Sequence, residues 1–246
     1  VIPVKLLQFV GIDAVEKIWR DSGVVGGDFP KDLTLALGSI TTKPIDMALF
    51  YAALANGGFQ VTPQYIYKIE NKFGEIIYEA KPQKKKIFEP EDVAILTYML
   101  QNAVNYGTGQ SAKVFKNGKL IPMAGKTGTT SDYVSAWFTG YTPTLATVVY
   151  VGNDDNKSMG GGMTGGAAAG PIWKNYMQSV VNIENYNVGF FEFIDDYIKR
   201  KDLTLREIDL KIGLLDTDGV DKRTALFKAG TEPVEYEGKF KGGITY

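Results

Sequence analysis

The sequence of 246 residues contains no histidine and no cysteine. Without imidazole or thiol groups there can be no Ser-His-Asp triad, no cysteine nucleophile, no disulfide and no metal site built from these ligands. Any catalytic chemistry must therefore use serine, threonine, lysine, tyrosine or carboxylate side chains. We expect no cofactor and no bound metal.

A large net charge and long apolar runs are also missing. The 27 basic and 28 acidic side chains give a formal net charge of −1, which disfavours nucleic acid as a partner. The longest apolar run, 47–55, has nine residues, whereas a helix that spans a bilayer needs about 20. Hydrophobic residues nevertheless make up 44% of the chain, which is enough for a substantial core.

Apolar residues at helical spacing predict a helix after Pro44, Pro90 and Pro171, because proline suits the first helical position. Asn56-Gly57-Gly58 and Gly107 are expected to end the first two helices. The side chains expected on one face of the second helix are Val93, Leu96, Leu100 and Ala103. Those expected on one side of the third are Trp173, Tyr176, Met177 and Val180.

Extended runs rich in β-branched and aromatic residues predict the strands. A hairpin is expected over 65–79 with its turn at 71–74, and three neighbouring antiparallel strands are expected within 120–130, 135–141 and 145–153. Helices that precede a strand meander, which is followed by another helix, indicate an α+β fold rather than alternating βαβ units.

The chain becomes more polar beyond about Ile183, with strand-like pieces at 203–210. We therefore divide it into a main domain at 1–183 and a C-terminal appendage at 184–246. Two acidic segments resemble the beginning of calcium loops, yet both lack glycine at the sixth loop position, so we interpret them as turns. They are Asp154-Asp155-Asn156 and Asp216-Thr217-Asp218-Gly219.

Several glycine motifs suggest nucleotide binding, but their spacing argues against it. A P-loop needs a glycine five positions before Gly125, where the chain has Leu120. Gly107-Thr108-Gly109 follows a helix rather than a strand, so a helix-ending loop is expected instead of a dinucleotide site. The glycine-rich stretch at 160–170 has two open interpretations, a flexible linker or a loop that borders a cleft.

Lys126-Thr127-Gly128-Thr129-Thr130 is the segment with the most specific chemistry. A strand with a lysine ammonium and two hydroxyls at alternate positions can hold a carboxylate. Residues 127 and 129 point the same way because side chains alternate along a strand. The glycine between them lets a peptide lie along the strand as an added β-partner.

In its context this segment resembles the third active-site motif, Lys-Thr-Gly, of the penicillin-binding proteins. The runs at 136–143 and 151–155 resemble the strands that follow the motif in this family. The other segments that resemble class A, bifunctional members are 35–39, Pro44 with Ala48 and Tyr51, 55–58, 165–166 with 168–173, and 230–233.

The resemblance implies an α+β fold of the penicillin-binding protein and serine β-lactamase type, with an antiparallel sheet covered by helices. It also implies a DD-transpeptidase that cross-links peptidoglycan stem peptides through an acyl-serine intermediate and is acylated by β-lactams. Such a protein acts outside the cytoplasm, in the periplasm or on the outer face of the cytoplasmic membrane, where the N-terminal portion anchors it. Class A members also carry a glycosyltransferase domain in that portion.

The chain departs from the family pattern in its serines. The family uses Ser-x-x-Lys for the nucleophile and its probable base, and Ser-x-Asn for a proton relay, and none of the seven serines here begins either motif. We therefore expect this chain to be the C-terminal part of the transpeptidase domain, beginning just after Ser-x-Asn. Its partner is the N-terminal portion of the same protein, and the isolated chain is expected to be inactive.

The resemblance also implies roles for the motif residues. Lys126 stabilises negative charge and tunes the relay serine, so we take it as catalytic. Thr129 is assigned to both groups, because its backbone N–H forms half of an oxyanion hole and its side chain helps to hold the substrate. Thr127 grips the carboxylate of the substrate or β-lactam, and Gly128 and Thr130 complete the substrate-binding set.

Two rival interpretations remain open. One is a fragment of a serine β-lactamase or DD-carboxypeptidase of the same superfamily. The other is a non-catalytic module that keeps the Lys-Thr-Gly strand only to bind a peptidoglycan peptide. The residues upstream of the chain discriminate between enzyme and binder, since only the enzyme needs the two serine motifs.

Overall fold

The structure is a computed structural model that describes residues 2–24, 29–81, 84–210, 213–215 and 221–233. The predicted turn at 216–219 and the end of the appendage, 234–246, lie outside the described residues.

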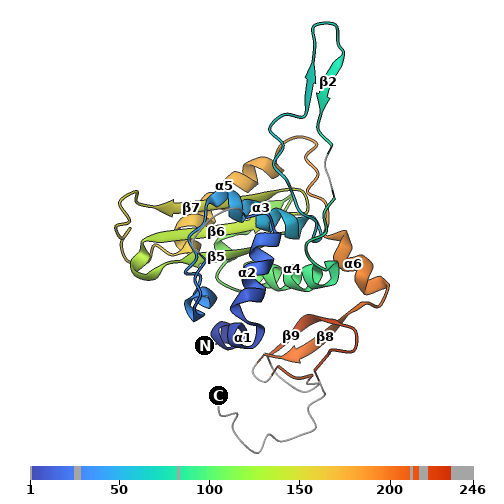
Figure 1. Cartoon of the computed structure of the whole chain (residues 1–246). Coiled ribbons are helices and arrows are strands. Elements are labelled where there is room, and N and C mark those ends of the chain that lie inside the picture. Colours follow the sequence, from blue (N-terminus) through green and yellow to red (C-terminus); the bar gives the residue numbers. More distant parts are fainter. Residues whose placement is uncertain (1, 25–28, 82–83, 211–212, 216–220, 234–246) are drawn as a thin grey trace, which may run out of the picture.

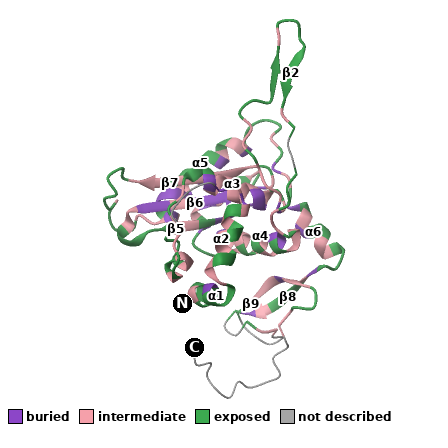
Figure 2. Ribbon diagram, in the orientation of Figure 1, coloured by how far each residue is buried: buried purple, intermediate pink, exposed green. Residues whose placement is uncertain are grey.

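Three antiparallel strands form the sheet at the centre of the fold (Figure 1). They are β5 (Ala124–Thr129), β6 (Ser135–Tyr141) and β7 (Ala146–Gly152), in the spatial order β5-β6-β7. Continuous pairing joins β6 to both neighbours, as the three extended runs predict. All but one residue of β6 is buried, so this strand is the centre of the core (Figure 2).

Two hydrophobic clusters occupy the two faces of the sheet, because successive side chains of β6 point to opposite sides. On one face Phe138 packs with Trp173 and Met177 of α5 (Gly170–Val181). On the other face Tyr141 packs with side chains of α3 (Pro44–Ala55) and of α4 (Pro90–Asn105). The α+β fold with helices covering an antiparallel sheet is confirmed.

The remaining elements are short. The hairpin of β1 (Lys68–Glu70) and β2 (Ile76–Glu79) is confirmed and extends away from the sheet, with every strand residue exposed (Figures 1 and 2). The helices at the beginning of the chain are α1 (Ile2–Val10), α2 (Ile12–Asp21) and the 3-10 turn η1 (Leu33–Leu37). The small elements around the main sheet are η2 (Gln110–Ala112), β3 (Phe115–Lys116), β4 (Lys119–Leu120), η3 (Ser131–Tyr133) and the π-helix η4 (Gly165–Ala169).

All three proline-initiated helices are confirmed, and α3 ends at glycines with positive φ, Gly57 and Gly58. The apolar faces expected from helical spacing are only partly buried. Leu96 of α4 is 38% exposed, while the buried positions of α4 are Val93, Ala94, Thr97 and Val104. Thr97 can enter the core because its hydroxyl hydrogen-bonds the Tyr141 hydroxyl at 2.9 Å.

The expected face of α5 is likewise only partly buried. Tyr176 is 49% exposed, whereas Trp173, Met177 and Val181 are buried. These three lie four residues apart, which places them on one stripe of the helix. The Trp173 indole N–H also donates to the Thr147 carbonyl oxygen at 3.1 Å, and this bond favours the orientation with Trp173 inside.

The C-terminal segment contains α6 (Glu192–Lys199), β8 (Leu203–Asp209) and β9 (Lys222–Lys228). The strand piece at 203–210 is confirmed, whereas α6 and β9 were not predicted. This segment packs on α4: Lys228 pairs with Asp92 at 2.6 Å, and the Tyr98 hydroxyl donates to the Thr224 carbonyl oxygen at 3.3 Å. The division at 183/184 stays a prediction.

The burial pattern of α5 gives a stability test. Trp173→Ala should lower the free energy of unfolding by about 3–5 kcal/mol, because it removes a large buried side chain and leaves a cavity against Phe138. Tyr176→Ala, on the exposed side of the same helix, should change it by about 0.5 kcal/mol or less. Urea unfolding followed by circular dichroism measures both, and equal losses would contradict this orientation of α5.

Candidate active site

The segment Lys126–Thr130 lies along the outer strand of the sheet. β5 pairs with β6 on one side, and within the part of the chain that the structure describes no strand pairs with its other side. Thr130 N–H donates to the Ser135 carbonyl oxygen at 3.1 Å, and this bond shows which residues of β5 direct their backbone groups toward β6. Hydrogen bonding alternates along antiparallel strands, so the backbone groups of Thr127 and Thr129 point away from β6, toward the unpaired edge.

The side chains of β5 alternate between the two faces of the sheet. Lys126 is paired with Thr139 and Gly128 with Trp137, so these residues share a face. Thr127 and Thr129 point to the opposite face, in agreement with the prediction that they point the same way. Each makes a contact there: the Thr127 hydroxyl lies 2.6 Å from that of Thr108, and the Thr129 hydroxyl accepts from Gly165 N–H at 2.9 Å.

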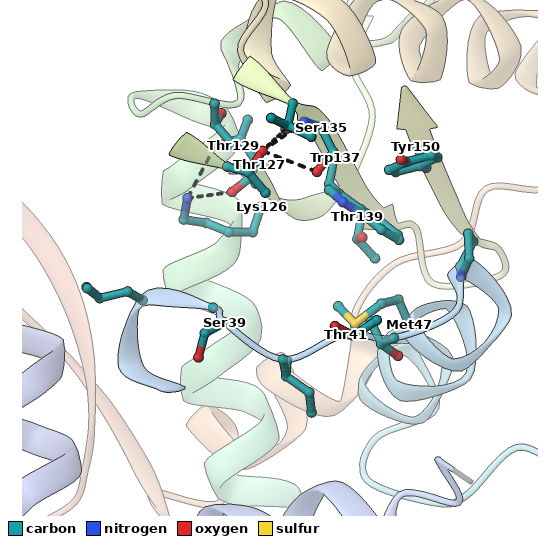
Figure 3. Close-up of a pocket in the computed structure, with 18 of the residues that line it drawn as sticks. Ser39, Thr41, Met47, Lys126, Thr127, Thr129, Ser135, Trp137, Thr139 and Tyr150 are labelled. Atoms are coloured by element: carbon teal, nitrogen blue, oxygen red, sulfur yellow. Dashed lines mark hydrogen bonds between the residues drawn. The ribbon is translucent and has the colours of Figure 1, made fainter. Parts of the chain in front are cut away.

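A cleft of about 880 Å³ opens beside this edge (Figure 3). One wall comes from 37–42 and the beginning of α3, and the other from β5, Trp137 and Thr139 of β6, and Tyr150 of β7. The rings of Trp137 and Tyr150 contact each other with centroids 4.8 Å apart. The cleft is within the usual size range of ligand sites, and hydroxyl groups, aromatic rings and one ammonium line it.

The side chain of Lys126 extends around the edge of β5, so that its ammonium lies beside Thr127. It donates to the Thr127 carbonyl oxygen at 3.1 Å and lies 3.3 Å from the Thr127 hydroxyl oxygen (Figure 3). The side chain remains exposed, yet the surrounding walls remove part of its water, and this desolvation lowers the pKa of Lys126 below its usual range. The structure therefore places a cation beside one of the two predicted carboxylate-binding hydroxyls.

Gly128 lines the cleft without a side chain that would occupy it. A Cβ at this position would lie 3.1 Å from the Cβ of Trp137. A larger side chain would project over the indole into the space between the walls. This explains why glycine stands between Thr127 and Thr129, as the sequence suggested for close approach of a peptide.

Thr130 has a different environment from the other predicted site residues. It lines the cleft, but its hydroxyl accepts from Ser135 N–H at 2.8 Å and so stabilises the turn between β5 and β6. Asp132 and Tyr133 in this turn have φ of 56° and 55°, a left-handed conformation that is uncommon outside glycine. Two consecutive residues in this conformation persist only where surrounding contacts stabilise them. One such contact is the hydrogen bond from Met159 N–H to the Tyr133 carbonyl oxygen at 2.9 Å.

Three serines line the cleft, Ser39, Ser131 and Ser135. Among the described residues, none of them forms a hydrogen bond with Lys126. The lining at 37–42 and the aromatic ring of Tyr150 were not predicted as part of the site, because both depend on long-range packing. Trp137 forms part of the cleft wall, whereas Phe138 is fully buried in the core. The glycine-rich stretch contacts β5 through Gly165, so it borders this region.

No helix in the described ranges has the length and apolar content that crossing a membrane requires.

Comparison with known proteins gives a consistent family. The family described as "Penicillin binding protein transpeptidase domain" matches residues 20–178. Penicillin-binding protein 1A of Neisseria gonorrhoeae is 32% identical over 182 residues, which cover 72% of this chain and 22% of that protein. Penicillin-binding protein 1A of Aquifex aeolicus is 32% identical over 230 residues, which cover 94% of this chain and 30% of that protein. The chain thus spans less than a third of the length of these relatives.

Solved structures agree with the sequence matches. The crystal structure of penicillin-binding protein 1A from Haemophilus influenzae aligns with a TM-score of 0.75 at 25% identity, covering 94% of this chain and 38% of that one. The structure of PonA1 from Mycobacterium tuberculosis in complex with penicillin V aligns with a TM-score of 0.62 at 25% identity, covering 73% of this chain and 52% of that one.

The environment of Lys126 gives a titration test. The partial desolvation of Lys126 disfavours its charged form, so the folded chain should release this proton at a lower pH than the unfolded chain. The unfolded state then binds more protons between the two pKa values, and stability rises with pH across that interval. Reductive ¹³C-methylation and NMR follow the lysines, and Lys126→Arg identifies the resonance. A midpoint equal to that in urea would contradict the desolvation.

Proposed function

The chain belongs to the penicillin-binding protein transpeptidase family, and from this premise we propose that it supplies one wall of the active site of a peptidoglycan DD-transpeptidase. In the proposed reaction a serine of the N-terminal portion attacks the D-Ala-D-Ala amide, and the amide nitrogen leaves with D-alanine. The acyl group then passes to an amine on a neighbouring strand, and the serine is restored. β-Lactams acylate the same serine.

The observation that carries this proposal is the unpaired edge of β5 beside the cleft. An extended peptide can add to this edge as a further strand, because the backbone N–H and C=O groups of Thr129 point outward there. A donor at the Thr129 N–H supports its proposed role as half of an oxyanion hole, with the serine N–H as the other half.

The proposed carboxylate site combines Thr127 and Thr129 with the charge of Lys126. Both hydroxyls lie on one face at the edge of β5, and the Lys126 ammonium reaches around to Thr127. Hydroxyl donors next to a cation suit the carboxylate of a stem peptide or of a β-lactam. Gly128 leaves the approach to the strand open, and Thr130 is proposed to hold the turn that ends it.

The N-terminal portion of the same protein is the proposed partner of the chain. It would bring the Ser-x-x-Lys and Ser-x-Asn motifs, the glycosyltransferase domain and the membrane anchor, and the site would lie outside the cytoplasm. Exposed apolar side chains on α1 support such packing: Ile2 is 70%, Leu6 58% and Phe9 90% exposed. We also propose residues 1–183 as transpeptidase domain and 184–246 as an appendage.

The absent nucleophile can be tested directly. The isolated chain should form no covalent adduct with a fluorescent penicillin, because none of its serines begins a Ser-x-x-Lys motif, whereas the longer protein that contains it should be labelled. Denaturing gel electrophoresis and mass spectrometry detect the acyl group. A stable adduct on the isolated chain would overturn the assignment, and an unlabelled longer protein would favour the non-catalytic binder.

The role of Lys126 can be tested in the longer protein. Lys126→Ala should slow acylation by penicillin roughly 100-fold, since it removes a charge that stabilises the developing anion. The fold should be retained, because the side chain is exposed and packs little. Lys174→Ala, an exposed lysine on α5, is the matched control and should acylate at the parent rate. Stopped-flow acylation kinetics measure both, and an unchanged rate for Lys126→Ala would remove this residue from the mechanism.

A further inference from the structure

Thr108 lies next to the proposed carboxylate site, although it comes from a different element. It stands in the loop that follows α4, and its hydroxyl oxygen is 2.6 Å from the Thr127 hydroxyl oxygen. The sequence predicted only a helix-ending loop for Gly107-Thr108-Gly109. The contact between Thr108 and Thr127, which are 19 positions apart, indicates that this loop does more than end the helix.

The two glycines place Thr108 by letting the loop fold back on the last turn of α4. A Cβ at Gly107 would lie 2.8 Å from the Ala103 carbonyl oxygen, and a Cβ at Gly109 would lie 3.1 Å from the same atom. Gly109 N–H donates to this oxygen at 3.1 Å. The loop is therefore fixed against the helix, and the position of Thr108 relative to β5 is defined.

The number of donors and acceptors on the Thr127 hydroxyl indicates what the Thr108 hydroxyl does. A hydroxyl has one O–H and two lone pairs, whereas a lysine ammonium can only donate. Lys126 donates to one lone pair of the Thr127 oxygen at 3.3 Å. If the Thr108 hydroxyl donates to the second lone pair, the Thr127 O–H is left free to donate to a ligand.

Thr129 is arranged in a parallel way. Gly165 N–H can only donate, and it does so to the Thr129 hydroxyl oxygen at 2.9 Å. A Cβ at position 165 would lie 2.4 Å from the Trp137 carbonyl oxygen, so the approach of this N–H requires glycine. Each of the two threonines thus has a neighbouring donor on its oxygen. With Thr108 as the donor in its contact with Thr127, both threonine O–H groups are available to the same acceptor.

We propose that Thr108 is a positioning residue for carboxylate recognition: it donates to the Thr127 hydroxyl and thereby directs the Thr127 O–H toward the carboxylate of the substrate or β-lactam. This inference rests on the proposed function. It extends the recognition site from β5 to the loop after α4. Thr108 does not line the cleft, so its effect must pass through Thr127.

The test compares two probes in the longer protein, penicillin V with its free carboxylate and penicillin V methyl ester. Thr108→Val keeps the shape of the side chain and removes the hydroxyl, and it should slow acylation by the acid about tenfold while leaving the ester rate unchanged. Thr108→Ser retains the hydroxyl and should restore the acid rate. Thr231→Val is the matched control, because Thr231 is exposed and its hydroxyl donates to the Lys228 carbonyl oxygen at 2.8 Å.

A double variant separates positioning from general damage. If Thr108 acts through Thr127, Thr108→Val should add no further loss in a Thr127→Val background. Equal slowing of acid and ester, or additive losses, would overturn the inference and leave the proposed function standing. Full acid rates for Thr108→Val would do the same. A parent protein that neither probe acylates would overturn the proposed function, and this inference with it.

Discussion

The pairing of β5 with β6 is the constraint on which the candidate site depends. Because the Thr130 N–H donates to the Ser135 carbonyl oxygen, the alternation of an antiparallel ladder leaves the backbone groups of Thr127 and Thr129 on the unpaired edge. The same pairing places the Lys126 side chain on the face of the sheet that carries Trp137. The side chains of Thr127 and Thr129 lie on the opposite face. A register shift of one residue would exchange these faces and remove every proposed contact.

The rest of the fold holds this edge in place from both sides. One core cluster packs Phe138 against Trp173, and the other packs Tyr141 against residues of α3 and α4. This packing favours peptide binding along β5, because a strand that is already extended and ordered loses less conformational entropy when the peptide binds. Glycines that allow close backbone contact fix the two segments that reach the threonines, which are the loop after α4 and the beginning of η4.

Local pattern predicted much of this arrangement. The alternation of 127 and 129, the three strands and the proline-initiated helices follow from periodicity and turn chemistry, which act over a few residues. Periodicity does not predict which side chains are buried where long-range packing determines burial. Leu96 is exposed, whereas Thr97 is buried in the core, where its hydroxyl hydrogen-bonds that of Tyr141. The contact between Thr108 and Thr127 could not be predicted for the same reason, since only the packing of α4 along β5 brings these residues together.

In the function that we propose, the edge of β5 recognises the carboxylate and the reacting carbonyl of the substrate. The most direct measurement is a crystal structure of the longer protein acylated by penicillin V. We expect a carboxylate within hydrogen-bonding distance of the Thr127 and Thr129 hydroxyls, with the ester carbonyl oxygen accepting from the Thr129 N–H. A carboxylate held by other residues, or an acyl group that leaves the edge of β5 uncontacted, would contradict it.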